Sequence, residues 1–329
     1  MGHDMLMVGV DGGGTGTRAV LITPGGRCLG YGVAGRGNPI SAGVAPAAAA
    51  VLTAVRSAMA SAGCRLSDVS VIVAAQAGQP ASGEGTESLR DLLRSAGFGG
   101  TVRFESDLLA TYFSGTADDS GYAVVSGTGA CAIRVVGGRI DAAADGLGWL
   151  LGDRGSGFWI GQRVAKAAIR DLDGAGPATA LTRDLLEHLG IAPEASRGGG
   201  RPPSLEQLVG VLYGKPPIEL ASFAPLAFRS AEDPVASGIL RRAGEHLADS
   251  LAAVLAGPGP LVVGGGVLFR PGPVREAFVR RLGDAAADLD LRAVEDGVVG
   301  AGLLALRTGG HPVTTETLDR LADAVARVR

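Results

Sequence analysis

Lysine is scarce in this chain, occurring only at positions 166 and 215, although lysine and arginine together number 30. Neither lysine lies in a glycine-rich segment, so the lysine-containing phosphate loop of P-loop nucleotide-binding proteins is absent. The chain also has no block of basic residues, and its formal net charge is −3. These absences argue against a nucleic acid or an anionic membrane surface as a partner.

Cysteine is also sparse. Cys28, Cys64 and Cys131 are widely spaced and odd in number, so they form neither a zinc-binding pattern nor a disulfide framework. The N-terminus has no basic segment followed by an apolar one, which predicts that there is no signal peptide. The most apolar run, 42–62, is interrupted by proline and polar residues and suits a soluble helix. The sequence therefore predicts a cytoplasmic protein.

Aromatic residues make up only 4% of the chain, whereas hydrophobic residues as a whole make up 46%. Alanine, valine and leucine must therefore fill the core, and 329 residues suffice for about two domains. Apolar runs of strand length alternate with helical segments, which predicts parallel or mixed α/β sheets. In the first third of the chain we expect strands at 8–11, 19–22, 27–33, 69–75 and 101–105, and helices at 42–62, 84–95 and 106–114.

Glycine, in contrast, is abundant, and the segment 8–20 reads VGVDGGGTGTRAV. This pattern predicts a strand, a glycine-rich turn and an antiparallel return strand. The N–H groups of such a turn, free of side-chain bulk, can bind phosphate, and Thr15 and Thr17 add hydroxyl donors. Asp11, at the end of the strand, could hold a hydrated Mg²⁺. The alternative is a tight hairpin with an acidic first residue.

The same pattern starts again at Tyr122. A strand leads into Gly127-Thr128-Gly129, a return strand follows at 132–136, and a Gly-Gly-Arg turn ends it, as Gly-Gly-Arg ends the first hairpin at 25–27. Two domains with the same core topology would place two phosphate-binding hairpins opposite each other across a cleft. Chance similarity of two glycine-rich hairpins is the alternative.

The second half of the chain is more helical. A buried strand at 261–263 ends in three glycines, 264–266, and the Gly-, Arg- and Pro-rich segment 196–203 predicts a mobile loop. We expect helices at 155–170, 179–189, 234–256, 297–306 and 315–329.

With three glycine turns in this order, the chain resembles the actin-like superfamily, which includes sugar kinases and heat-shock chaperone ATPases. The turns at 11–15, 126–129 and 263–266 are similar to its first phosphate hairpin, second phosphate hairpin and adenosine loop. The segment 145–160, DGLGWLLGDRGSGFWI, is similar to the Gly-Trp-Gly-x-x-x-Gly-Asp-Glu-Gly-Ser signature of the N-acetylglucosamine kinase branch. That branch is grouped with the BadF/BadG-type ATPases.

The resemblance implies an α/β fold of two actin-like (ribonuclease H-like) lobes, each a mixed sheet with helices, around an ATP cleft. It implies an N-terminal lobe at 1–117, joined by a C-terminal helix at 314–329, and a larger lobe with helical insertions at 118–313. The implied activity is transfer of the γ-phosphate of MgATP to the 6-hydroxyl of an amino sugar, with N-acetylglucosamine as the first candidate. Because relatives are often dimers, a homodimer is also expected.

Position by position, the resemblance makes Asp107 the catalytic base and Asp11 the carboxylate near Mg²⁺. The residues expected to bind the sugar are Asn38, Asp107, Thr128, Gly129, Gly146, Asp153 and Gly157. The residues expected to bind ATP are Gly13, Gly14, Thr15, Thr17, Gly127, Thr128, Gly265 and Gly266. Plainer roles remain open for three of them: Asp107 can cap a helix, Asp153 can be a turn aspartate, and Asn38 can be a loop residue.

Three residues depart from the family pattern. Cys131 stands where N-acetylglucosamine kinases of the family can have Asn, Leu147 replaces Trp, and Arg154 replaces Glu. Because a thiol is a poor hydrogen-bond partner for a sugar hydroxyl, glucosamine, N-acetylmuramic acid and other amino sugars remain alternative acceptors. Trp149 could wall a sugar site, whereas Trp159, on a predicted helix, is expected in the core.

Other function classes fit less well. An ATPase that drives a protein partner, such as the iron–sulfur activators of acyl-CoA dehydratases, needs clustered cysteines, which this chain lacks. A non-catalytic sugar-responsive binding protein finds no support in a helix-turn-helix extension or a basic face. Two lobes around a cleft imply closure on sugar binding, with the Gly-rich junction 115–121 and the C-terminal helices as the expected hinges.

Overall fold

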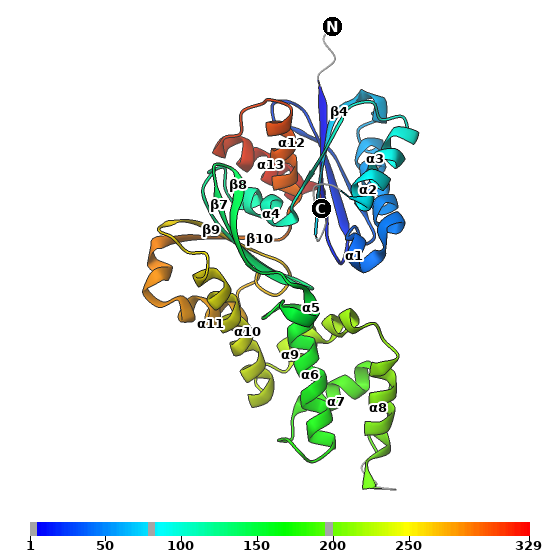
Figure 1. Cartoon of the computed structure of the whole chain (residues 1–329), viewed down its shortest axis with the longest axis vertical. Coiled ribbons are helices and arrows are strands. Elements are labelled where there is room, and N and C mark those ends of the chain that lie inside the picture. The colour runs from blue at the N-terminus through cyan, green and yellow to red at the C-terminus, as the bar shows by residue number, and fades with distance from the viewer. Residues whose placement is uncertain (1–4, 78–82, 195–199) are drawn as a thin grey trace.

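The computed structural model of the chain describes residues 5–77, 83–194 and 200–329. These residues form two five-stranded sheets with the strand orders β3-β2-β1-β4-β5 and β10-β9-β6-β7-β8. Figure 1 shows the two sheets one above the other, with a helical extension below the second. We call each sheet with the helices that cover it a lobe. The predicted fold class of two α/β lobes is confirmed.

The central strand of the first sheet has the same kinds of neighbour as the central strand of the second. β1 pairs antiparallel with β2 and parallel with β4, and β6 pairs antiparallel with β7 and parallel with β9. The first sheet consists of β1 (Leu6–Gly12), β2 (Thr17–Ile22), β3 (Cys28–Ala34), β4 (Val69–Gln76) and β5 (Thr101–Glu105). The second consists of β6 (Gly121–Ser126), β7 (Ala130–Val136), β8 (Arg139–Asp145), β9 (Gly259–Gly264) and β10 (Leu289–Val294).

The first sheet is covered on both faces, and alternate residues of β1 reach the two sides because successive side chains of a strand point in opposite directions. Val8 and Val10 pack with one set of helices, and Met7 packs with the other. Figure 1 shows the two sets on either side of the sheet. The first set is α1 (Pro39–Ala42), α2 (Val44–Ala60) and α3 (Glu84–Ser95). The second set is α4 (Asp107–Gly115), α12 (Val298–Thr308) and α13 (Thr315–Val328).

Glycines let α12 lie unusually close to its neighbours. A Cβ on Gly9 of β1 would lie 2.2 Å from the backbone nitrogen of Gly302, and a Cβ on Gly300 would lie 1.8 Å from the carbonyl oxygen of Ala110 in α4. The N–H of Gly300 donates to Ser114 Oγ at 2.8 Å. This close crossing brings the start of α12 to the end of β1, where Asp11 lies.

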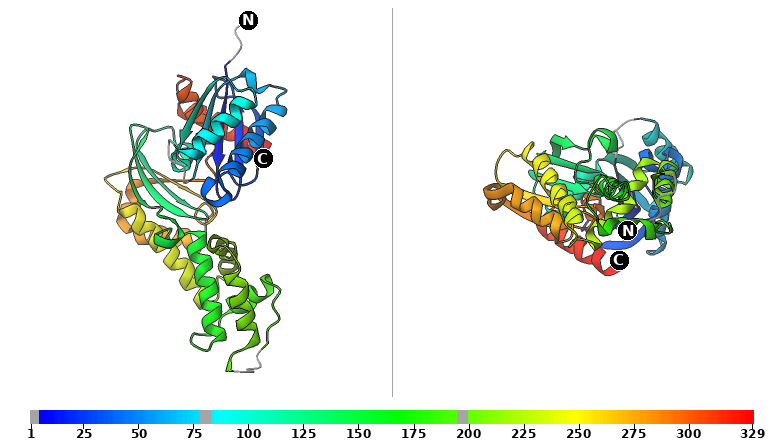
Figure 2. Two further views of the ribbon diagram at one scale, coloured as in Figure 1. Left: turned by 45° about the vertical axis from the view of Figure 1, so that its right-hand side comes forward. Right: turned by 90° about the horizontal axis from the view of Figure 1, so that it is seen from below.

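The second lobe carries most of the helices, and one continuous apolar cluster joins α6, α7 and α10 to the sheet. Figure 2 shows α7 and α8 at the end of the molecule far from the first sheet. The helices of the second lobe are α5 (Gly148–Leu151), α6 (Gly157–Leu172), α7 (Ala180–His188), α8 (Pro203–Tyr213), α9 (Ala224–Arg229), α10 (Pro234–Ala252) and α11 (Pro273–Leu282). None of the helices in the described parts of the chain is long and apolar enough to cross a membrane.

The predicted helix 84–95 and strand 101–105 are confirmed to the residue. The helix predicted at 42–62 is confirmed as α2, two residues shorter at each end, and Gly43, with φ of 88°, separates it from the short α1. Much of the predicted loop 196–203 lies outside the described residues, and its last residue, Pro203, begins α8 instead. The predictions missed the short helices α1, α5 and α9, and also α8, α11 and β10. The boundary between residues 117 and 118 stays a prediction.

Candidate active site

The first glycine turn joins β1 to β2 and is closed by a hydrogen bond from Gly13 N–H to the carbonyl of Gly16 at 2.9 Å. The hydroxyl of Thr17 donates to the carbonyl of Gly35 at 2.8 Å, and Thr17 is buried. Thr15 is exposed at the tip. The structure therefore gives Thr17 a role in shaping the turn, and it leaves the tip, with Gly14 and Thr15, accessible to a ligand.

Asp11 lies buried where β1 enters this turn. Its Oδ2 accepts a hydrogen bond of 2.9 Å from the N–H of Gly297, the residue before α12. Burial is the main reason that the pKa of Asp11 is raised to about 7, and the nearby charges of Asp296 and Asp107 raise it further. A crowded, desolvated carboxylate of this kind would be stabilised by a cation.

Mg²⁺ fits this position by donor chemistry, since it prefers carboxylate oxygen and keeps several waters. In the described residues no group of three or more His, Cys, Asp or Glu side chains could hold a metal ion. Asp296 is already paired with Arg18 at 2.9 Å and with Arg329 at 2.7 Å. Asp11 is thus a carboxylate that could hold Mg²⁺.

The second glycine turn joins β6 to β7 and is held from the side of α6. The N–H of Gly157 donates to the carbonyl of Gly127 at 2.7 Å, and the N–H of Phe158 donates to the carbonyl of Thr128 at 3.2 Å. Ser126 Oγ donates to the carbonyl of Gly155 at 3.0 Å. The start of α6 therefore fixes the position of this turn.

The third glycine turn, after β9, contacts the second turn directly. The N–H of Val267 donates to the carbonyl of Ser126 at 2.9 Å. Gly265 has a φ of 83°, and a Cβ there would lie 2.4 Å from the carbonyl oxygen of Ser126. Both the backbone conformation and this close contact require glycine at position 265. The backbones of the second and third turns therefore lie in direct contact.

The first and second turns face each other across the two lobes. A Cβ built on Gly14 would lie 3.5 Å from Thr128 Oγ1 and 4.0 Å from Ser41 Oγ, in α1. Asn38 begins α1, and its Oδ1 accepts a hydrogen bond from the N–H of Ile40 at 2.8 Å. Asn38 is therefore a helix cap, with its amide oxygen engaged locally, at the place where the two turns meet.

Asp107 begins α4, but it does not cap the helix. The cap is Ser106, whose Oγ accepts a hydrogen bond from Leu108 N–H at 3.2 Å. The helix-cap interpretation of Asp107 is therefore wrong. The carboxylate is half-buried, and desolvation raises its pKa to about 6. Its charge also raises the pKa values of Asp11 and Cys131, so Asp107 lies within electrostatic range of both residues.

Asp153 brings the signature segment to the second turn. It is buried, its Oδ1 accepts a hydrogen bond of 3.1 Å from Ala130 N–H, and a Cβ on Gly129 would lie 3.0 Å from that oxygen. The N–H of Gly146 donates to the carbonyl of Ala130 at 2.9 Å. The structure thus brings together five of the predicted sugar-binding residues, Thr128, Gly129, Gly146, Asp153 and Gly157.

The structure also accounts for Arg154, which the family pattern did not explain. Its Nε lies 3.6 Å from Oδ2 of Asp145, a residue whose side chain is only 2% exposed. Asp145 also accepts hydrogen bonds from the backbone N–H groups of Asp153, at 2.6 Å, and Arg154, at 2.9 Å. Sequence reasoning assigned Asp145 no role, since its partners become visible only when the segment 145–154 folds back on itself.

The remaining departures lie at the same site. Cys131 is directly opposite Asp145 in the β7–β8 pair, and a Cβ on Gly146 would lie 2.9 Å from its Sγ. Burial, together with the charges of three aspartates, raises the pKa of Cys131 to about 12, so the thiol stays neutral. Leu147 and Trp149 are exposed, whereas Trp159 is buried, which confirms the predicted core role of Trp159.

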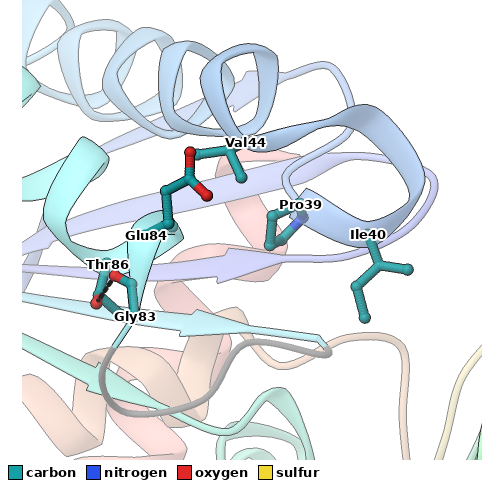
Figure 3. Close-up of a pocket in the computed structure, with 7 residues that line it drawn as sticks. Pro39, Ile40, Val44, Gly83, Glu84 and Thr86 are labelled. Carbon is teal, nitrogen blue, oxygen red and sulfur yellow. Dashed lines mark hydrogen bonds between the residues drawn. The ribbon is translucent and has the colours of Figure 1, made fainter.

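A shallow pocket of about 240 Å³ lies beside α1, between Pro39, Ile40 and Val44 on one side and the start of α3 on the other. Figure 3 shows the Glu84 side chain directed toward Val44, and Thr86 donating to the carbonyl of Gly83. Its walls are mainly apolar, and it holds none of the predicted site residues.

Comparison with known protein families identifies the fold and the site together. The model of the BadF/BadG/BcrA/BcrD ATPase family matches residues 8–305, a range that includes all three glycine turns and the signature segment. This chain belongs to that family. Membership of the BadF/BadG/BcrA/BcrD family confirms the resemblance seen in the sequence.

Relatives of this family member include two kinases. The N-acetylmuramic acid/N-acetylglucosamine kinase of Clostridium acetobutylicum is 28% identical over 254 residues, which cover 76% of this chain and 79% of that protein. The N-acetyl-D-glucosamine kinase of Dictyostelium discoideum is 29% identical over 217 residues, 62% of this chain and 65% of that protein. A solved structure from Chromobacterium violaceum, a candidate N-acetylglucosamine kinase, is 26% identical, with a TM-score of 0.70 over 92% of this chain and 99% of that one.

Proposed function

We propose that this member of the BadF/BadG/BcrA/BcrD family is an ATP-dependent kinase of an amino sugar, with N-acetylglucosamine as the first candidate. It would transfer the γ-phosphate of MgATP to the 6-hydroxyl of the sugar. The observation that carries the proposal is the meeting of Gly14 of the first turn with Thr128 of the second. Asp107 supports it, because its carboxylate is partly exposed and its charge acts on Asp11 at the first turn. The kinase relatives support the same reaction.

On the nucleotide side, the proposal uses backbone groups more than side chains. The N–H groups of Gly14 and Thr15, at the exposed tip of the first turn, and of Thr128, in the second, would contact the phosphates. The N–H of Gly127 already donates to the carbonyl of Gly129 at 2.9 Å, so Gly127 would serve only by letting a phosphate approach the backbone. Gly265 and Gly266 would allow the nucleoside to approach the backbone. Asp11 would hold Mg²⁺, which when bound neutralises phosphate charge during transfer.

On the acceptor side, Asp107 would act as the base. Its carboxylate takes the proton of the 6-hydroxyl as the sugar oxygen forms a bond to the γ-phosphorus and the bond from that phosphorus to ADP breaks. A pKa of about 6 leaves Asp107 ionised at neutral pH while keeping it more basic than an ordinary aspartate. Asp153, Gly129 and Gly146 would hold the sugar in line, because phosphoryl transfer depends on positioning.

The acceptor sugar is the part of the proposal with the most alternatives. Glucosamine, N-acetylmuramic acid and other amino sugars are the alternative acceptors. The alternative function is that of an ATPase that acts on a protein partner. A homodimer, a cytoplasmic location, and closure of lobes 1–117 and 118–313 about the junction 115–121 also stay predictions.

A coupled assay of ADP release across a panel of amino sugars tests the function. We expect ADP release that depends on Mg²⁺ and on one amino sugar, with the product identified as a 6-phosphate by phosphorus NMR. Asp107→Ala should lower kcat by about 10²- to 10⁴-fold, because it removes the base. Asp91→Asn, which removes an exposed carboxylate on α3, is the matched control and should leave kcat unchanged. No sugar-dependent ADP release, or full activity in Asp107→Ala, would refute the proposal.

A further inference from the structure

Asp145 is a buried carboxylate at the end of β8, and it is not one of the residues predicted to bind the substrates. Its Oδ1 accepts the N–H of Asp153 at 2.6 Å, and its Oδ2 accepts the N–H of Arg154 at 2.9 Å. A Cβ on Gly152 would lie 2.3 Å from Oδ1 of Asp145, so the backbone of 152–154 is wrapped around this side chain. Both oxygens of Asp145 are therefore used to fix one short stretch of backbone.

The backbone that Asp145 holds is in an unfavourable conformation. Asp145 and Asp153, with φ of 65° and 55°, are the non-glycine residues with positive φ in the parts of the chain that the structure describes. A non-glycine residue with such a φ is strained and persists only where surrounding contacts enforce it. The contacts that enforce it at Asp153 are the hydrogen bond from its N–H to Asp145 and that from Ala130 N–H to its Oδ1.

These contacts determine which carboxylate oxygen of Asp153 is available to accept a hydrogen bond from a ligand. Oδ1 is engaged by Ala130, whereas Oδ2 accepts no hydrogen bond from the described residues. A Cβ on Gly129 would lie 3.1 Å from Oδ2, so Oδ2 borders the second turn. A loss of the two bonds from the N–H groups of Asp153 and Arg154 to Asp145 would let the peptides on both sides of Asp153 rotate and would move Oδ2 away from the second turn.

We infer that Asp145 is a positioning residue for the acceptor sugar, holding Asp153 so that Oδ2 can accept a sugar hydroxyl. The inference rests on the proposed function for its substrate. Asp145 also explains why Arg154 is tolerated at this point, since the guanidinium pairs with its carboxylate at 3.6 Å. Arg154 itself is half-exposed, and exposed ion pairs contribute little, so the two backbone hydrogen bonds carry the effect.

The test measures sugar KM, ATP KM and kcat separately in Asp145→Ala and Asp145→Asn. Asp145→Ala should raise the sugar KM by about tenfold or more and leave the ATP KM within about twofold, because a displacement of 1 Å in a site is costly. Asp145→Asn should give a smaller increase, about threefold, because Asn tolerates positive φ and keeps one acceptor for Asp153 N–H. This graded rescue separates positioning from a general loss of stability.

Asp141→Asn is the matched control. Asp141 lies on the same strand and pairs with Arg134 at 2.7 Å, exposed and without contact to Asp153. We expect its sugar KM to equal that of wild type. Equal increases of sugar and ATP KM in Asp145→Asn, or an unchanged sugar KM in either Asp145 variant, would overturn the inference.

Hydrogen exchange at the Asp153 and Arg154 amides supplies a readout that does not need the reaction. In wild type these amides should exchange slowly, and in Asp145→Ala they should exchange faster while the amides of α6 stay protected. Fast exchange in wild type would overturn the inference even in an active kinase. Slow exchange in a wild-type protein that releases no ADP with any sugar would contradict the proposed function and leave the positioning of Asp153 supported.

Discussion

The two glycine hairpins share one topology but differ in what holds them. The first turn is closed by its own hydrogen bond from Gly13 to Gly16 and by a bond from Gly37 N–H to the carbonyl of Gly13 at 3.1 Å. The second turn also has a bond of its own, from Gly127 N–H to the carbonyl of Gly129 at 2.9 Å, but it is further fixed by the start of α6 on one side and by the third glycine turn on the other. The strand that enters the first turn carries Asp11, whose carboxylate accepts a hydrogen bond from the start of α12. The strand that enters the second turn ends at Ser126, whose hydroxyl donates to the carbonyl of Gly155.

This difference shows how a repeated hairpin can acquire two functions. The first hairpin combines a buried carboxylate with an exposed tip, which suits a metal ion and the phosphates of a nucleotide. The second hairpin couples the phosphate side to the signature segment, since Gly127 and Gly129 lie in one turn and Asp153 contacts only the second of them. We therefore expect mutations in the first turn to weaken the binding of nucleotide and metal. In the second turn, we expect some mutations to weaken nucleotide binding alone and others to weaken sugar binding alone.

The largest effect should come from Asp11→Asn in the first turn. The amide can still accept the hydrogen bond from Gly297 N–H, so the fold should persist, but the negatively charged ligand for Mg²⁺ is lost. We expect kcat to fall by about 10²-fold or more and the Mg²⁺ concentration for half-maximal rate to rise. An Mg²⁺ titration of ADP release measures both, and Ser126→Ala in the second turn should leave the Mg²⁺ dependence unchanged. A wild-type Mg²⁺ response in Asp11→Asn would contradict the assignment.

A pair of glycine substitutions should separate the sugar-binding role of the second turn from its nucleotide-binding role. A Cβ at Gly129 would lie 3.0 Å from Asp153 Oδ1, whereas a Cβ at Gly127 meets no atom within 4 Å. Gly129→Ala should therefore raise the sugar KM by about tenfold by displacing Asp153. Gly127→Ala should leave the sugar KM unchanged and raise only the ATP KM, because only a bound phosphate would contact the new methyl group. Steady-state kinetics with each substrate varied provide the measurement, and the reverse pattern would argue against this division of the turn.

The pH dependence should report Asp107 when Mg²⁺ is saturating, because a bound cation would keep Asp11, whose pKa is about 7, ionised. The base must be ionised, so with a pKa of about 6 the sugar kcat/KM should fall as pH decreases through 6, by about tenfold between pH 7.5 and pH 5. Because the folded-state pKa is raised, the contribution of Asp107 to stability is present at low pH and is lost as pH rises through about 6. A fall in activity at pH 5 is thus not expected from unfolding through this group, and thermal melts at both pH values check this. A flat profile down to pH 5 would contradict the role of Asp107.

The smallest effects should distinguish the two threonines of the first turn. Thr17→Val removes a hydroxyl that donates to Gly35 at 2.8 Å, which costs about 1 kcal/mol and lowers Tm by about 2 °C. Thr15→Val removes an exposed hydroxyl and should leave Tm unchanged while raising the ATP KM about threefold. Melting curves and ATP kinetics of both variants test this, and a lower Tm in Thr15→Val would show that its hydroxyl is structural.

Local patterns were enough to predict much of the fold. The strand at 101–105, the helix at 84–95 and the two hairpins follow from runs of apolar residues and from glycine at the turns, which act over a few residues. The misses have different causes. The edge strand β10 was missed although 289–292 alternates apolar and charged residues, which is the pattern of a half-buried strand. The short helix α1 was missed because only one glycine, with a positive φ, separates it from α2.

The two hairpins, their order and the signature segment can be predicted from the amino-acid sequence, because each is encoded by glycine and polar residues close together in the chain. The packing of the folded chain is needed to show that Gly14 meets Thr128, that Gly297 N–H reaches Asp11 and that Ser106, rather than Asp107, caps α4. It also decided the role of Asp145, whose carboxylate acts through backbone bent into positive φ. Contacts between distant segments depend on how the lobes pack, and no periodicity in the sequence records that packing.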